Sequence, residues 1–180
     1  MRVSHEIEIT PSRVVLSGVP VAVSETGGKM LVELYRRYAG DYPKFFKMDT
    51  LCRLGFIGAE LLLKQSGISS PVSAIIFANR SASIKNDNDY LATISEGNYY
   101  PSPALFVYTL PNIVTGEIAI RHHIQGETSF YILDNPEQLK PIVEASVNPD
   151  LTPSTCVLAG WCECSEADTF YAKLQIIWNN

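Results

Sequence analysis

The sequence lacks the features that mark membrane proteins and nucleic-acid-binding proteins. No stretch approaches the roughly 18 uninterrupted apolar residues that a membrane-spanning helix requires. The opening segment, MRVSHEIEIT, has no apolar core of a secretory signal. No run of Lys or Arg could follow a phosphate backbone, and the net charge is -5. We therefore expect a cytoplasmic protein without a membrane span and without a nucleic-acid partner.

Cysteine is scarce, and its distribution does not suit a disulfide framework. The chain has four cysteines. Cys156, Cys162 and Cys164 lie close together in one short segment, and Cys52 is far from them in the sequence. Small secreted domains that depend on disulfides use more cysteines at wider spacings. The four thiols are expected to be free.

The sequence also has no complete metal-binding motif. Cys162 and Cys164 are two residues apart on an expected strand, so their thiols face the same way, and Cys156 or the pair His122 and His123 could complete a site. A second, properly spaced pair of ligands is missing, which favours structural thiols over a metal centre. We predict that the protein holds no metal and no cofactor.

Two acidic residues, Asp87 and Asp89, could coordinate a cation. Their surroundings lack the glycine and the terminal glutamate of a calcium-binding loop. The polar stretch 79–89 around them is therefore predicted to be an exposed loop.

What is present indicates one domain, spanning residues 1–180. The chain is 46% hydrophobic, which is enough for one sizeable core, and it contains no internal repeat or low-complexity linker. Alternating polar and apolar residues predict a strand at 6–9, and a second short strand is expected at 14–16. An amphipathic helix is predicted from Gly28 to about Gly40.

The middle of the chain predicts buried elements. Asp49 can cap a helix that is apolar on most sides and ends before Gly67. The branched, apolar run 72–78 is typical of a strand that is covered on both faces. Prolines at 101 and 103 begin a helix that Pro111 interrupts before it continues over 113–120.

The final third predicts a strand at 128–133, a helix that starts at 134–136, and a hairpin of strands at 156–164 and 169–178. Strands that alternate with helices and close with a hairpin indicate an α/β fold, with a mixed, mostly parallel sheet layered by helices.

Several short motifs, in order, resemble β-ketoacyl synthases of the bacterial aryl-polyene and pigment type. They are 42–49 (YPKFFKMD), 59–61 (AEL), 101–103 (PSP), 110–112 (LPN), 116–120 (GEIAI) and 157–161 (VLAGW). The resemblance runs from about residue 30 to the end of the chain. It implies a thiolase-like fold, in which a complete enzyme has two similar halves with helices between two sheets. This chain has room for the first half.

The resemblance places the catalytic nucleophile in the turn after the strand at 128–133. The family has a cysteine there, activated at a helix N-terminus, whereas this sequence reads Leu133-Asp134-Asn135-Pro136. Asn135 or a neighbour stands near the nucleophile position, and an amide cannot form a thioester. The family's two histidines belong to the absent second half, so His122 and His123 are not assigned that role. We predict no catalytic residues.

Three further positions fall where the resemblance implies backbone packing. They are Asn112, Gly116 and Gly126. We expect them to shape the fold rather than to perform chemistry.

These observations favour an accessory, non-catalytic protein of the chain-length-factor type in fatty-acid, polyketide or aryl-polyene biosynthesis. Half a thiolase fold should leave an apolar layer uncovered, which suggests a homodimer or a heterodimer with a full-length ketosynthase. An acyl carrier protein is a further candidate partner. The alternatives are a small enzyme that binds or transfers acyl groups through Cys52 or the region of Cys162 and Cys164, and a purely structural remnant of the fold.

Overall fold

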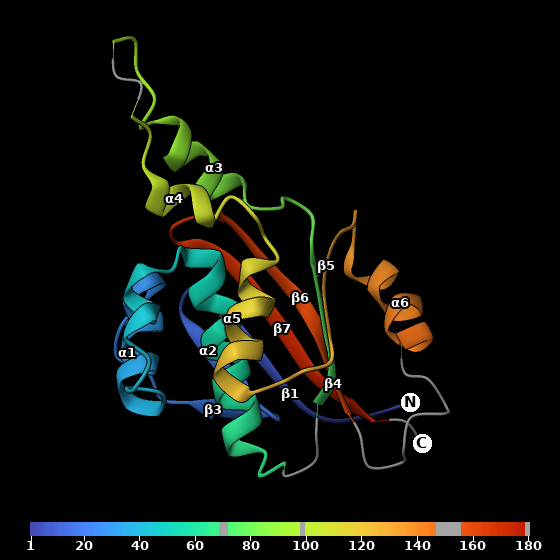
Figure 1. The fold of residues 1–180 in the computed structure, drawn as a ribbon. Coiled ribbons are helices and arrows are strands. Elements are labelled where there is room, and N and C mark those ends of the chain that lie inside the picture. Colours follow the sequence, from blue (N-terminus) through green and yellow to red (C-terminus); the bar gives the residue numbers. More distant parts are fainter. Residues whose placement is uncertain (69–71, 98–99, 147–155, 179–180) are drawn as a thin grey trace.

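The computed structural model describes residues 1–68, 72–97, 100–146 and 156–178, and within them seven strands form one mixed sheet (Figure 1). The strand order is β3-β2-β1-β7-β6-β4-β5. The strands are β1 (Arg2–Thr10), β2 (Arg13–Leu16), β3 (Val19–Val21), β4 (Val72–Asn79), β5 (Glu127–Ile132), β6 (Cys156–Glu166) and β7 (Thr169–Trp178). The α/β class is confirmed, and so is the C-terminal hairpin.

Parallel pairing does not predominate, so this part of the expectation is wrong. Strand β4 pairs in parallel with β5 and β6, whereas the other four neighbouring pairs are antiparallel. The reason is the short connections at both ends of the chain, because only antiparallel neighbours can be joined by a tight turn.

The helices lie on both faces of the sheet (Figure 1). Helices α1, α2 and α5 cover one face, and α6 covers part of the other. The helices are α1 (Gly27–Tyr38), η1 (Pro43–Lys47), α2 (Thr50–Gln65), α3 (Ile84–Leu91), α4 (Pro103–Val107), α5 (Ile113–His122), η2 (Pro136–Gln138) and α6 (Leu139–Ser146). In the described ranges, no helix combines the length and the apolar character needed to cross a membrane.

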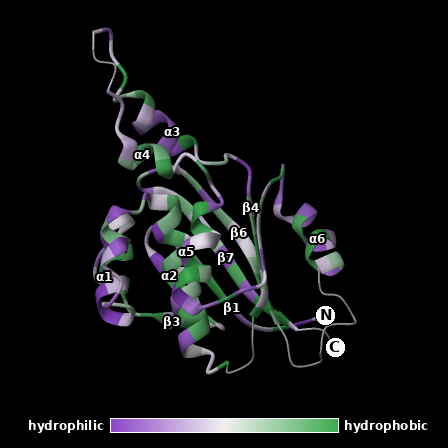
Figure 2. Cartoon of the chain, viewed as in Figure 1, coloured by the Kyte–Doolittle hydropathy of each residue, from purple (hydrophilic) through white to green (hydrophobic). Residues whose placement is uncertain are grey.

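Helix α2 forms as its sequence predicts. The Asp49 carboxylate accepts a hydrogen bond from the Cys52 amide at 2.9 Å and so caps the N-terminus. Gly67, just beyond the end of the helix, has a φ of +63°, which side chains disfavour and glycine permits. The helix packs against α1, α5 and strands β1, β6 and β7, which explains why it is apolar on most sides (Figure 2).

The apolar run of β4 contributes to two cores. Ile75 and Phe77 join the core under α2, whereas Ala74, Ile76 and Ala78 join the smaller core under α6. Successive side chains of a strand point to opposite faces, so a strand covered on both sides must be apolar throughout.

The predicted loop at 79–89 is wrong, because residues 84–91 form helix α3. Its polar side chains are paired rather than solvated: Lys85 forms an ion pair with Asp89 one turn away, and buried Asn86 donates from Nδ2 to the carbonyl of Leu105 at 2.8 Å. Helices α3 and α4 project beyond the end of the sheet (Figure 1). We call the described residues 84–97 and 100–110 the arm.

Candidate functional site

The turn after β5 presents an amide at the start of a helix. The Asn135 side chain accepts a hydrogen bond from the Gln138 amide at 3.3 Å, and Gln138 Oε1 accepts one from the Asp134 amide at 2.9 Å. This reciprocal pairing satisfies backbone N–H groups at the start of η2, where the helical interior supplies no acceptor. The turn from Leu133 to Pro136 therefore has the backbone form of a helix N-terminus, with a capping amide and without a thiol.

The four cysteines lie elsewhere, and all are buried and outside any disulfide. Cys162 and Cys164 face the core shared with α2, as their spacing predicted. Burial raises the pKa of the Cys156 thiol to about 11 and that of Cys164 to about 12, and it raises the pKa of Cys52 and Cys162 well above the ordinary value. Thiols with such pKa values stay protonated at neutral pH, so they are poor nucleophiles.

The histidine pair lies at the C-terminal end of helix α5. His122 is the last residue of α5, and its Nε2 lies 3.1 Å from Oε1 of Glu60. His123 follows with a φ of +54° and stops the helix. Glu60, which belongs to another helix, therefore orients the His122 ring.

The acidic residues of α3 are engaged with their own helix. Asp89 pairs with Lys85, and Asp87 accepts a hydrogen bond from the Ser83 hydroxyl at 3.2 Å. Among the described residues, no three His, Cys, Asp or Glu side chains are arranged to hold a metal ion.

A buried charge cluster surrounds Glu60, and sequence reasoning missed it. The Glu60 side chain is fully buried, with Arg121 Nε at 2.8 Å, Lys64 Nζ at 2.9 Å and His122 at 3.1 Å. Asp41 pairs with the same Arg121. Burial alone would raise the pKa of Glu60, but hydrogen bonds from His122, Lys64 and Arg121 outweigh it and lower that pKa to about 2. The sequence did contain one signal of this cluster, because Glu60 is the single carboxylate within an apolar helical run.

The three positions assigned to backbone packing behave differently. A side chain at Gly126 would place its Cβ 1.8 Å from the carbonyl oxygen of Ser73, so glycine is required where β5 begins beside β4. At Gly116 the same Cβ would meet open space, so its expected packing role is wrong. Asn112 precedes α5 without a capping hydrogen bond from its side chain.

The arm concentrates exposed apolar side chains. Seven large hydrophobic residues in it are more than 40% exposed: Ile84, Leu91, Ile94, Tyr100, Phe106, Val107 and Leu110. Large exposed apolar patches on a monomer often mark interfaces with other proteins.

The two edges of the sheet differ in their protection. Strand β3, at one edge, has three residues and includes Pro20, which cannot donate a hydrogen bond. Strand β5, at the other edge, has six residues without proline or lysine, and Ile132 at its end is 52% exposed. The amide of Leu133 donates to the carbonyl of Asn79 at 2.8 Å, so β5 ends beside the root of the arm.

The sheet face beside α6 is not the uncovered apolar layer that was expected. Gln175 donates to Glu6 at 3.1 Å, and Lys173 lies 3.7 Å from the same carboxylate. Glu8 of β1 lies opposite Lys173 of β7 in the strand register, on this same face of the sheet. Polar side chains at alternate positions of β1 and β7 let water cover this part of the sheet.

Comparisons with known proteins identify the fold. No family model matches the sequence, and no curated protein matches it. A structure of the ketosynthase ApeO in complex with its chain length factor ApeC, from Xenorhabdus doucetiae, superposes with a TM-score of 0.67 at 12% identity and covers 99% of this chain and 79% of the other. The ishigamide ketosynthase/chain length factor gives 0.62 at 12% identity, with 98% and 61% covered. The protein has a thiolase-like, ketosynthase-type fold.

The chain spans less than two thirds of the second of these structures. Within the described residues, the thiolase-like fold is represented by a single sheet with helices on both faces. Helix α6 carries Lys140 and Glu144 on its exposed side, and only Leu139 and Val143 are buried. The helix that follows the turn at Asn135 is therefore partly solvated.

Proposed function

We propose that the protein is a non-catalytic partner of a ketosynthase, of the chain-length-factor type, in polyketide or aryl-polyene biosynthesis. The observation that carries the proposal is the turn at Asn135. A ketosynthase-type fold here presents a capping amide at a helix N-terminus, while the thiols are buried and protonated elsewhere. The two similar structures are a ketosynthase in complex with its chain length factor and the ishigamide ketosynthase/chain length factor.

The exposed surface supports pairing with another chain. The arm offers apolar side chains, and β5 beside its root offers an unguarded sheet edge. We place the ketosynthase contact on this continuous region. The same complex would receive chains from an acyl carrier protein, and a homodimer is the alternative assembly.

Pairing is tested by co-expression with a full-length ketosynthase from the same organism. We expect the two chains to co-purify in equal amounts, and the triple variant Leu91→Ser, Phe106→Ser, Leu110→Ser to lose the ketosynthase while keeping its circular dichroism spectrum. Val19→Ser, which removes an exposed apolar side chain on the opposite edge strand, is the matched control. Co-purification that survives the triple variant, or fails with the unaltered chain, would overturn the proposal.

Lack of catalysis is tested by thiol chemistry. The protein, incubated with malonyl- and acyl-thioesters, should show no covalent adduct by intact-mass spectrometry. The four thiols should resist a disulfide reagent until denaturant is added, because all are buried and protonated. An adduct on a named cysteine would instead support the acyl-transferring alternative, and elongation of a carrier-bound chain by the isolated protein would contradict the proposal.

A further inference from the structure

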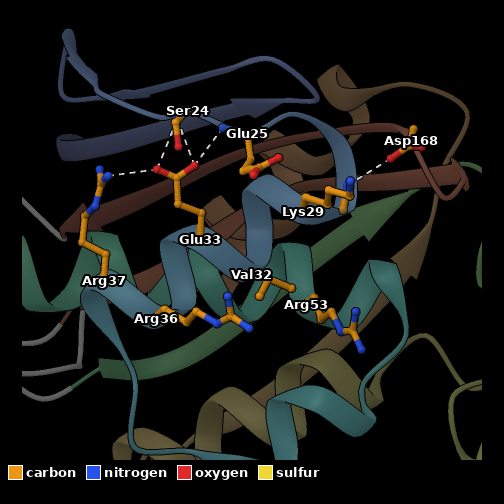
Figure 3. A pocket seen from close by; sticks show the side chains of 10 residues that line it. Ser24, Glu25, Lys29, Val32, Glu33, Arg36, Arg37, Arg53 and Asp168 are labelled. Atoms are coloured by element: carbon orange, nitrogen blue, oxygen red, sulfur yellow. Dashed lines mark hydrogen bonds and ion pairs between the residues drawn. The ribbon is translucent and has the colours of Figure 1, made fainter.

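We draw no further inference here: the strongest candidate, the groove of about 910 Å³ along the exposed face of α1 (Figure 3), is lined by four basic and three acidic side chains, so its charge selects no occupant, and nothing in the described part of the structure shows what covers it.

Discussion

At the scale of single residues, two carboxylates of the α2 region have pKa values displaced in opposite directions. Glu60 is fully buried but surrounded by three basic side chains, which lower its pKa from 4.5 to about 2. Asp49 caps the same helix, and its burial raises its pKa from 3.8 to about 6. The difference follows from the side-chain hydrogen bonds that Glu60 accepts from these three residues, because burial penalises both carboxylates.

We predict that Glu60→Gln destabilises the protein by about 3 kcal/mol at neutral pH, because it leaves Arg121, Lys64 and His122 together without their carboxylate. Since folding lowers the pKa of Glu60, the stabilisation that its carboxylate gives the folded state is complete above pH 4.5. It is lost as the pH falls through about 2. Denaturant titrations across that range should show a shallower acid-side decline in the variant. The control is Glu144→Gln, whose exposed pair with Lys140 at 3.9 Å should contribute less than about 1 kcal/mol. Equal effects of the two substitutions would contradict the prediction.

For Asp49 the pH dependence of stability has the opposite sign. Folding raises its pKa, so its contribution to the free energy of unfolding is complete below pH 3.8 and is lost as the pH rises through about 6. We expect Asp49→Asn, which keeps a good capping side chain, to stabilise the protein by about 1 to 2 kcal/mol at slightly alkaline pH and to have little effect at pH 3.8. Asp49→Ala should lose about 1 kcal/mol of capping free energy at either pH. A pH-independent effect of Asp49→Asn, measured by urea unfolding, would argue against the buried charge.

At the scale of elements, close approach of backbones decides which glycines matter. Strand β5 can lie beside β4 only because Gly126 has no side chain near Ser73, whereas Gly116 occupies open space on α5. The arm shows the complementary case. Its helix α3 forms from a polar sequence because Asn86 and Asp89 find partners in the folded chain.

The two glycines give a matched pair of substitutions. Gly126→Ala should destabilise the protein by about 2 to 4 kcal/mol, because its Cβ would overlap backbone atoms that cannot move away without disturbing β4. Gly116→Ala should stabilise it by up to about 1 kcal/mol, because alanine favours a helix interior and meets no neighbour. Urea unfolding of both variants checks the prediction, and similar effects of the two would refute it.

At the scale of the whole molecule, one sheet separates two cores of unequal size. The larger core lies under α1, α2 and α5, and the smaller one lies under α6. Strands β4 and β6 supply side chains to both, so neither core can lose its packing without disturbing the other. We propose on this ground that residues 1–180 form a single domain.

A single domain should unfold in one transition. Trp161 packs in the core under α6, whereas Trp178 packs against the larger core, so the two indoles report on opposite faces. We expect the variants Trp161→Phe and Trp178→Phe, each with one remaining tryptophan, to show a fluorescence midpoint in urea that coincides with the midpoint of far-ultraviolet circular dichroism. Separate fluorescence and dichroism midpoints in either variant would indicate two independent units.

The sequence alone determined most of the elements and the α/β class. The helix capped by Asp49, the strand β4 buried on both faces and the C-terminal hairpin follow from local patterns, because periodicity and capping depend on neighbouring residues. The absence of a cysteine from the turn at Asn135 and the start of a helix there were also visible in the sequence, whereas the two side-chain hydrogen bonds that cap this turn required the structure.

The tertiary structure decided what depends on partners distant in the chain. Helix α3 needed Leu105, and the buried Glu60 needed basic side chains from α5 as well as from its own helix. The balance of antiparallel and parallel pairs came from how the two ends of the chain meet in the sheet, where β1 pairs with β7. These features depend on residues that are far apart in the sequence, and only folding brings such residues into contact.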